Sequence, residues 1–267
     1  MVTEQPPSQI QVPPSVAALA AGRAVRPLWE NELGGRSFLI GAAGAGQMFV
    51  KWTPAESGID LAAERDRMAW AGAYTPVARP LALDADETGS WLVTTALPGE
   101  SAVSPGWLAD PRTAVTAIGT GLRALHDRLP VADCPFSWAA AGRVALARRG
   151  VAAGWLNPAR WHEEHRPLGV AGALEKASQI PPADRLVVCH GDACAPNTLL
   201  DEEGRWSAHV DLGDLGVADR WADLAVATWS TAWNYGPGWA GVLLAAYGVE
   251  PDPARTRYYR LLWDLGP

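Results

Sequence analysis

Three polar residues in one short segment have the types and spacing that phosphate chemistry requires. In VVCHGDACAPNTLLDEEGRWSAHVDLG, residues 187–213, Asp192 follows an apolar run, Asn197 comes five residues later and Asp211 fourteen residues after that. Two strands joined by a turn at residues 202–204 would bring Asn197 and Asp211 side by side. Their amide and carboxylate oxygens are hard ligands that suit Mg²⁺ carrying nucleotide phosphates. Asp192 could orient an attacking hydroxyl and accept its proton, so the segment predicts phosphoryl transfer with Asp192 as the catalytic base.

A lysine and a glutamate upstream could complete this chemistry. Lys51 lies in the strand-like run MFVKW, and Glu64 follows thirteen residues later in LAAERDRMAWAGAY, which suits an amphipathic helix. The carboxylate could pair with the lysine and hold it against the α- and β-phosphates. Only two of the 22 basic residues are lysines. In a chain that uses arginine almost everywhere, a compact ammonium at position 51 indicates a role that the planar guanidinium does not fill equivalently.

A glycine-containing turn that covers the phosphates should precede the lysine strand by one intervening strand. GGRS at residues 34–37 lies at about that place, so Gly35 and Ser37 are predicted to contact the nucleotide. The more glycine-rich GAAGAG at residues 41–46 is only five residues before Lys51 and is predicted to be a hairpin turn.

The elements that must position these groups fall into two regions, which predicts an α+β fold with a small β-rich lobe and a larger helical lobe. LPGE, residues 97–100, ends regular structure, and we place the lobe boundary there, with an N-lobe at 26–97 and a C-lobe at 98–267. The proline-rich first 25 residues are expected to be a flexible arm. Strands are predicted at 37–40, 47–52, 91–96, 186–189, 198–200 and 207–210, and helices at 61–74, 112–127, 158–177, 223–233 and 239–247.

Composition excludes several classes of protein. With 48% hydrophobic and 19% charged residues the chain is not generally disordered. Its net charge of −7 argues against a nucleic-acid or anionic-membrane partner and is compatible with a cationic ligand. Three cysteines are too few for a disulfide framework, and no apolar run is long enough to span a bilayer. A cytoplasmic location is expected.

Taken together, the motifs resemble those of the aminoglycoside phosphotransferases, small-molecule kinases with a protein-kinase-like bilobal fold. The resemblance runs from about residue 30 to the C-terminus and is carried by HGDACAPN, VDLGDLGVADRWADLA, FVKW, AERDRMAW, TTALPGE and DCPF. It implies ATP and Mg²⁺ as cofactors, with Asn197 and Asp211 as the metal ligands. It also implies that residues 94–97, including Thr95 and Leu97, offer backbone groups to adenine.

Two subgroups of this family share features with the chain. Many 3'-kinases of kanamycin and neomycin end in Asp-Glu-Phe-Phe. This chain ends in LLWDLGP and therefore lacks that ending, as streptomycin 3''-kinases do. HGDAC and GVADRWADLAVAT resemble some 3'-kinases. We expect phosphorylation of streptomycin at its 3'' hydroxyl, conferring resistance. The alternatives are a 3'-kinase and a kinase of another small hydroxyl compound, in a monomer or a dimer.

One residue departs from the family pattern. The family usually has Asp-x-Gly-Arg, and position 214 is aspartate in this chain. Either Asp214 grips a cationic group of the substrate or catalysis is impaired, and the second possibility would make the protein a nucleotide-binding pseudokinase. Asp264, near the C-terminus, is a further candidate for a pocket that receives a polycation. Asp219 and Asp223 could bind substrate, although Asp219 is better explained as a helix cap.

Zinc is a remote alternative. Cys189, His190 and Cys194 form one possible ligand set, which has no second pair at ligand spacing. His162 and His165 form another, which lacks the Glu-x-x-His helix of zinc proteases. His190 is instead predicted to bond the loop backbone, and the WHEEHR segment that contains the other two histidines is predicted to be a solvated helix face.

Overall fold

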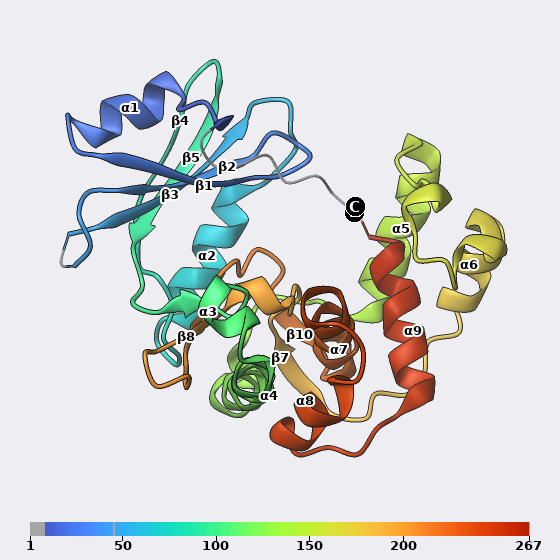
Figure 1. The fold of residues 1–267 in the computed structure, drawn as a ribbon. Helices are drawn as coiled ribbons and strands as arrows, with labels where there is room; N and C mark the ends of the chain where they lie inside the picture. Colours follow the sequence, from blue (N-terminus) through green and yellow to red (C-terminus); the bar gives the residue numbers. More distant parts are fainter. Residues whose placement is uncertain (1–8, 45, 267) are drawn as a thin grey trace. The chain divides into compact units, whose positions relative to one another are not determined.

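A five-stranded antiparallel sheet with the order β1-β2-β3-β5-β4 forms the first part of the computed structural model, which describes residues 9–44 and 46–266 (Figure 1). The chain divides into two compact units between Pro98 and Gly99, and this sheet belongs to the first. Its elements are α1 (Pro14–Ala20), β1 (Val25–Glu30), β2 (Arg36–Ile40), β3 (Met48–Pro54), α2 (Leu61–Ala71), β4 (Pro80–Ala85) and β5 (Gly89–Thr95).

The two faces of this sheet carry different kinds of side chain, because successive side chains along a strand point to opposite sides. One set of alternate residues is apolar and forms a buried core with α1, namely Phe38, Ile40, Val50, Trp52, Trp91 and Val93. The other set includes Ser37, Lys51 and Leu92, which lie opposite one another on β2, β3 and β5. Figure 1 shows α1 and α2 on opposite sides of the sheet. The lysine is therefore presented on the side where α2 lies.

Helix α1 corrects the expectation of a flexible arm over residues 1–25. Ile10, Val16 and Ala20 are buried in the core of the first unit, and Pro14 occupies the first turn, where its missing N–H costs nothing. The prolines that suggested an extended arm thus start a short helix whose apolar residues cover the sheet. The first eight residues of the predicted arm lie outside the described residues.

The second unit is mainly helical, with short strands beside the polar segment. Its elements are β6 (Glu100–Ser101), α3 (Pro105–Leu108), α4 (Pro111–Arg128), α5 (Ala140–Ala153), α6 (Gly169–Ala177), β7 (Leu186–Cys189), β8 (Thr198–Leu200), β9 (Trp206–His209), β10 (Gly216–Asp219), α7 (Trp221–Tyr235), α8 (Ala240–Tyr247) and α9 (Pro253–Asp264). Strands β6, β8 and β9 form one antiparallel sheet, and β7 pairs with β10.

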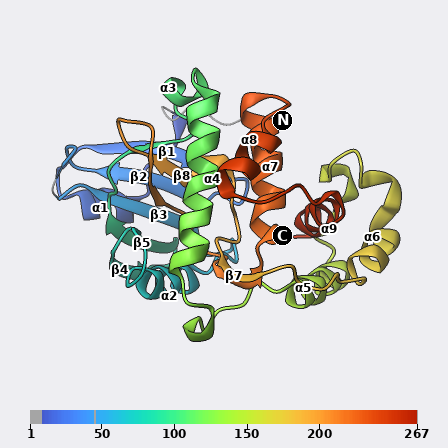
Figure 2. The same cartoon turned by 90° about the horizontal axis from the view of Figure 1, so that it is seen from below.

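Close helix packing builds the core of the second unit. Figure 2 shows α4 beside α7 and α8, and α5, α6 and α9 grouped together. Ile118, Leu122, Leu224 and Leu243 are buried in this core. At Gly119 a side chain would meet the carbonyl oxygen of Leu243 at 2.5 Å, so α4 approaches α8 this closely only because position 119 is glycine.

Most predicted elements are confirmed, with ends that shift by a few residues. The predicted α+β fold class is confirmed as well, with the β-rich unit first and the helical unit second. The stretch at 158–177 is two 3₁₀ turns, Pro158–Arg160 and Arg166–Leu168, followed by α6. GAAGAG falls between β2 and β3 as expected, although residue 45 lies outside the described residues. Sequence reasoning missed α1, β1, β4, β6, α3, α5, β10 and α9.

Within the described ranges, no helix combines the length and the apolar character that crossing a membrane requires.

Candidate active site

The predicted pair of Lys51 and Glu64 is present in the first unit. The Lys51 Nζ lies 2.7 Å from Glu64 Oε1, and the exposed fractions of the two side chains are 21% and 7%. Asp60 starts α2 by accepting hydrogen bonds from the amides of Ala62 and Ala63, which places Glu64 in the first turn. A partly exposed ammonium that is anchored by a more buried carboxylate can still reach an anionic ligand.

The turn before β2 is held by an asparagine rather than by its glycines alone. Asn31 Oδ1 accepts hydrogen bonds from the amides of Leu33 and Gly35 at 3.0 and 2.7 Å. A side chain at Gly35 would meet the Asn31 amide nitrogen at 2.7 Å. Ser37 lies opposite Lys51 in the β2–β3 ladder, on the same face. The structure thus brings Ser37 to the lysine, whereas the Gly35 amide bonds inside its own turn, and contact of either residue with a nucleotide stays a prediction.

The segment predicted to face adenine has one backbone donor left. The Thr95 amide donates to the carbonyl of Arg79 at 3.0 Å, and the Ala96 amide donates to the carbonyl of Gln47 at 3.1 Å. Among the described residues, nothing accepts a hydrogen bond from the Leu97 amide. Leu97, more than Thr95, is therefore the residue of this segment that could donate to a base.

In the second unit, the side chain of Asn197 is hydrogen-bonded to Asp192. The Asn197 Nδ2 donates to both the backbone oxygen and the Oδ2 of Asp192, each at 3.0 Å. This arrangement fixes the orientation of the amide group, because its nitrogen faces Asp192 and its oxygen is turned the other way. Among the described residues, the Asn197 oxygen accepts no hydrogen bond, so it could bind a cation.

The hairpin formed by β8 and β9 brings Asp211 back to Asn197, as the spacing predicted. Thr198 lies opposite His209, and the amide of Val210 donates to the carbonyl of Asn197 at 3.0 Å. Asp211 follows with φ +64°, a left-handed conformation that is uncommon for residues other than glycine. Backbone strain of this kind is often found at functional sites.

The carboxyl group of Asp192 is in an environment that disfavours its charge. Burial raises the pKa of Asp192, and the negative charge of Asp211 raises it further, against the lowering effects of Cys194, His190 and Asn197. Its Oδ1 is buried and accepts no hydrogen bond of normal geometry among the described residues, although the Cys194 thiol is close enough to affect the pKa. A repelled pair of carboxylates beside an amide oxygen fits a hard divalent cation, so Asn197 and Asp211 would hold Mg²⁺.

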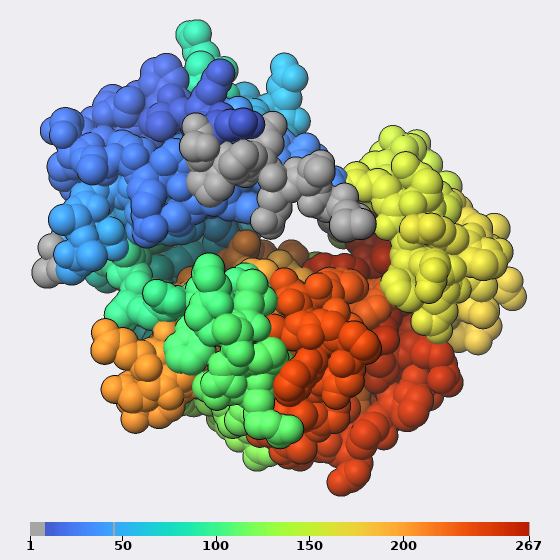
Figure 3. Space-filling model, in the orientation of Figure 1, coloured from blue at the N-terminus to red at the C-terminus, as the bar shows by residue number. Residues whose placement is uncertain are grey.

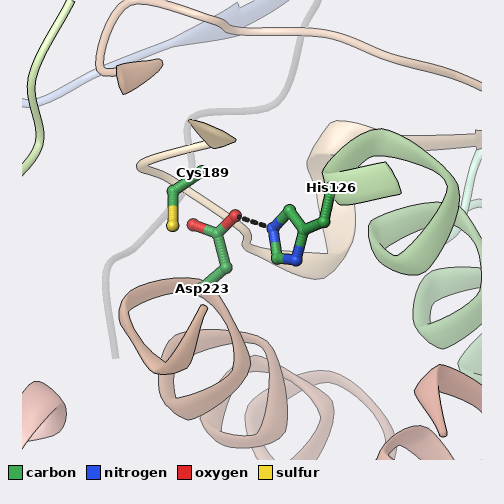
Figure 4. A group of neighbouring side chains, drawn as sticks. All are labelled: His126, Cys189 and Asp223. Carbon is green, nitrogen blue, oxygen red and sulfur yellow. Dashed lines mark hydrogen bonds and ion pairs between the residues drawn. The ribbon is translucent and has the colours of Figure 1, made fainter. Parts of the chain in front are cut away.

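Asp223, at the start of α7, supports the loop that carries Asp192. Its Oδ2 accepts from the His190 amide at 2.6 Å and its Oδ1 from the Gly191 amide at 3.0 Å. His126 Nε2 lies 2.9 Å from the same Oδ2, as Figure 4 shows, and His126 Nδ1 lies 2.8 Å from the Tyr247 hydroxyl. Burial acts to raise the pKa of Asp223, but the hydrogen bond and charge of His126, with the charge of His190 and the hydrogen bond from Gly191, outweigh it, so the pKa lies below its ordinary value.

This network corrects the prediction that Asp223 could bind substrate. Its side chain is fully buried, and both oxygens are occupied by the protein's own donors. Asp219 caps the start of α7 as predicted, because its Oδ1 accepts from the Trp221 amide at 3.0 Å. His190 also has the predicted structural role: its Nε2 lies 2.9 Å from the Val210 carbonyl, and its Nδ1 accepts from the Asp192 amide. It thus links the loop of the base to the loop of the metal ligand.

The buried group of His126, Cys189 and Asp223 has ligand atoms within 4.8 Å of one another, but its chemistry does not suit zinc (Figure 4). Burial raises the pKa of the Cys189 thiol well above its ordinary value, and this thiol donates to the carbonyl of Asp219. A metal would need the thiolate and would displace the donors on Asp223. Among the described residues, neither zinc set that the sequence suggested belongs to a group of three or more side chains that could hold a metal ion.

The two predicted substrate carboxylates have different surroundings. Asp264 Oδ2 accepts from the His162 amide at 3.0 Å and lies 2.6 Å from His165 Nδ1. The prediction that the WHEEHR segment is a solvated helix face is wrong. His165 is buried, and both histidines of the segment pack against Trp229 and contact Asp264 of α9. The backbone of Asp214 lies against Gly191 in the loop of the base. Contact of either aspartate with a substrate stays a prediction.

Sequence reasoning missed the part played by His126 and Tyr247 altogether. His126 is buried and ends the apolar stripe of α4, and Tyr247 ends α8. The signal that could have found the histidine is a polar residue at a position where the helical period requires an apolar one, because a buried polar side chain needs a partner.

Comparison with known proteins gives consistent matches over most of the chain. Residues 26–259 match the model of the phosphotransferase enzyme family APH. An aminoglycoside 3'-phosphotransferase of Streptomyces fradiae is 39% identical, over 78% of this chain and 81% of that protein. A streptomycin 3''-kinase of Streptomyces griseus is 40% identical, over 79% and 82%. The structure of aminoglycoside phosphotransferase APH(3'')-Id from Streptomyces rimosus in complex with ADP and streptomycin is 30% identical, with a TM-score of 0.67 over 88% of this chain and 93% of that one.

Proposed function

Because the chain belongs to the aminoglycoside phosphotransferase family, we propose that it transfers the γ-phosphate of ATP to the 3'' hydroxyl of streptomycin. The observation that carries the proposal is the Asp192–Asn197–Asp211 group, because its hairpin and hydrogen bonds bring together one carboxylate that could act as a base and two groups that could bind Mg²⁺. The structure similar to this chain that holds ADP and streptomycin supports both the nucleotide and the acceptor.

Asp192 would act as the base through one of its two oxygens. Asn197 occupies Oδ2, whereas Oδ1 is buried and lacks a hydrogen bond of normal geometry among the described residues. A raised pKa brings a carboxylate nearer to the operating pH and makes it a better proton acceptor. The acceptor hydroxyl oxygen would bond to the γ-phosphorus, the bond from that phosphorus to the bridging oxygen of ADP would break, and the hydroxyl proton would pass to Asp192.

The remaining residues would bind and neutralise the nucleotide. Mg²⁺, when bound, supplies positive charge beside the phosphates. Asn197 and Asp211 would hold this ion, and Lys51, oriented by Glu64, would contact the α- and β-phosphates. Ser37 lies on the lysine face, and the Leu97 amide would donate to adenine.

The choice of streptomycin depends on two features. A streptomycin 3''-kinase is among its relatives at 40% identity, and an aminoglycoside phosphotransferase solved in complex with ADP and streptomycin is 30% identical. A 3'-phosphotransferase is 39% identical, so phosphorylation of kanamycin or neomycin at the 3' hydroxyl is the second candidate. A net charge of −7 suits any of these polycations.

An ADP-release assay over streptomycin, kanamycin, neomycin and hygromycin tests the proposal. We expect release that depends on streptomycin, with a product that carries one phosphate at the 3'' hydroxyl by mass spectrometry and NMR. Asp192→Asn should lower kcat by roughly 10³-fold or more. Asp66→Asn, the same change at an exposed position of α2, should retain wild-type turnover.

The other outcomes are equally informative. Wild-type turnover by Asp192→Asn would exclude this aspartate as the base. Turnover of kanamycin or neomycin alone would replace streptomycin by the second candidate. Binding of ATP without release of ADP on any acceptor would support a pseudokinase, the alternative that Asp214 raises.

A further inference from the structure

Ser101 in β6 is a polar residue beside the site that none of the roles above uses. Its Oγ donates to the carbonyl of Pro196 at 2.8 Å, across 95 residues of sequence. The same oxygen accepts from the Val103 amide at 3.4 Å, and its single proton is directed to Pro196. Pro196 lies in the 3₁₀ turn Ala195–Asn197, which connects the loop of the base to β8. The hydroxyl therefore holds the residue that directly precedes the proposed metal ligand Asn197.

The backbone fixes β6, and with it Ser101, against the hairpin that leads to the metal ligands. β6 pairs with β8, and the Ala102 amide donates to the carbonyl of Thr198 at 2.8 Å. At Gly99, which has φ +101°, a side chain would meet the carbonyl oxygen of Leu200 at 2.6 Å, so β6 enters this closely only because position 99 is glycine. Figure 3 shows α3 and α4, which follow β6, in green between the orange turn of the β8–β9 hairpin and the orange-red α7–α8 segment.

Helix α7 holds the start of the same turn and the end of β6. Ser230 Oγ accepts from the Ala195 amide at 2.8 Å, and the Tyr235 hydroxyl donates to the carbonyl of Ala102 at 2.7 Å. Hydrogen bonds thus run in a closed ring from α7 to the turn, from the turn to β6 and from β6 back to α7. The bond between Ser101 and Pro196 is the member of this ring that lies next to Asn197.

The two serines of the ring differ in exposure. Ser230 is 1% exposed, so its loss would leave a buried amide unsatisfied. Ser101 is only half-buried, and water could replace its hydroxyl on the Pro196 carbonyl. Its bond therefore adds direction more than stability. A shift of the turn would displace the Asn197 oxygen from the cation, and it would also displace the Asn197 nitrogen from Asp192.

We propose that Ser101 is a positioning residue for phosphoryl transfer, whose hydroxyl holds the Pro196 carbonyl so that the Asn197 oxygen meets Mg²⁺. The proposal rests on the proposed function, because it concerns a metal ligand of the same site. Loss of a group that orients a metal ligand commonly lowers metal affinity or activity by roughly 10–100-fold. Because Ser101 bonds the neighbouring carbonyl and not the ligand itself, we expect an effect at the lower end of this range.

Ser101→Ala tests the proposal through the Mg²⁺ dependence of turnover. We expect kcat to fall roughly tenfold and the Mg²⁺ concentration for half-maximal activity to rise roughly tenfold, with an unchanged KM for streptomycin. Tm should shift by less than about 2 °C, because the hydroxyl is half-buried. Ser101→Thr keeps the hydroxyl and should retain at least roughly half of the wild-type kcat. Ser104→Ala removes a hydroxyl that bonds only Glu100 and should have wild-type activity.

If Ser101→Ala does not fold, Tyr235→Phe decides. This change releases the Ala102 carbonyl from α7 and leaves Ser101 in place on a less firmly held strand. It should raise the Mg²⁺ requirement in the same direction, by a few-fold. An unchanged Mg²⁺ requirement in this variant would contradict the proposal.

Calorimetry of ATP binding without an acceptor, with Mg²⁺ and with EDTA in its place, separates this proposal from the proposed function. We expect Ser101→Ala to bind ATP roughly tenfold more weakly than the wild type when Mg²⁺ is present, and equally well in EDTA. If the wild type phosphorylates no acceptor, the proposed function fails, whereas this difference would still support the role of Ser101. Equal affinities with Mg²⁺, equal weakening under both conditions, a change confined to the KM for streptomycin, or no recovery in Ser101→Thr would overturn the proposal.

Discussion

The charged groups of the two units are held in opposite ways. Lys51 and Glu64 are thirteen residues apart and need one strand, one helix and one ion pair of 2.7 Å. The loop of Asp192 depends on Asp223, which accepts hydrogen bonds from two loop amides that are 32 and 33 residues away in sequence. Asp223 in turn contacts His126, which is 97 residues away. Tyr247 contacts that histidine across 121 residues.

The two pairs, Lys51–Glu64 and His126–Asp223, differ in how far they are exposed, and this difference decides whether each can serve a ligand or mainly stabilises the fold. The Lys51 side chain is 21% exposed, so its ammonium reaches solvent while it is paired with Glu64 and can serve a ligand. The His126–Asp223 pair has no exposed surface, and each of its donors would be left unsatisfied if the carboxylate were removed. The first site should thus tolerate mutation structurally, whereas the second should not.

Asp223→Ala should show the largest effect. Removing the carboxylate leaves His126 and two loop amides without an acceptor, and we expect a loss of about 3–5 kcal/mol in the free energy of unfolding together with loss of turnover. Urea denaturation and ADP release measure the two effects. Asp223→Asn keeps an acceptor oxygen and should be less damaging. A stable but inactive Asp223→Ala protein would break the comparison, because Asp223 would then be purely functional.

Lys51→Met should affect activity almost alone. We expect kcat/KM for ATP to fall roughly 10²–10³-fold, because an electrostatic contact to the phosphates is lost. The free energy of unfolding should change by less than about 1 kcal/mol. Lys51→Arg retains the charge and tests whether the compact ammonium is needed. Extensive unfolding of Lys51→Met, measured by urea denaturation, would show that the pair is structural after all.

The same difference explains what the sequence could predict. Asp192, Asn197 and Asp211 are found from their spacing because a single hairpin connects them, and Lys51 with Glu64 because a strand and the next helix suffice. Local geometry fixes both sets. Their contacts with ATP, Mg²⁺ and an acceptor stay predictions.

The supporting residues could not be predicted because their contacts are made by packing. The place of His126 in the apolar stripe of its helix indicates that it is buried, but nothing near it in sequence indicates that its partner is Asp223. The edge strands β1 and β4 carry prolines at positions 27 and 80 and are mostly exposed on one side, so they lack the alternation of the central strands.

His126→Phe should have an intermediate effect that sharpens the comparison. The carboxylate of Asp223 loses one donor but keeps both loop amides, so we expect a loss of about 1–3 kcal/mol in the free energy of unfolding and only a few-fold loss in kcat. Tyr247→Phe removes the outer member of the network and should cost about 1 kcal/mol. A larger effect at Tyr247 than at His126 would contradict the order of these contacts.

Asp192→Asn should have the smallest effect on stability, and with the opposite sign. The pKa of Asp192 is raised above its ordinary value of 3.8, first by burial and then by Asp211, so the folded protein holds the proton more tightly than the unfolded chain. The stability of the fold therefore falls as the pH rises from 3.8 to the raised pKa of Asp192, and above that pKa the loss stays constant. We expect the neutral asparagine to raise Tm by about 1–3 °C at pH 7 while turnover is lost.

Below the ordinary pKa of aspartate both proteins are uncharged at position 192, so the difference in Tm should vanish there. Calorimetric scans at several pH values, without nucleotide or metal, measure this dependence. Asp66→Asn controls for the substitution itself, because that side chain is exposed. A lower Tm for Asp192→Asn at pH 7 would mean that the loop stabilises the charged carboxylate. In that case the charged carboxylate of Asp192 would not lower the free energy of unfolding of the second unit. The proposed base would then have no raised pKa to favour proton transfer.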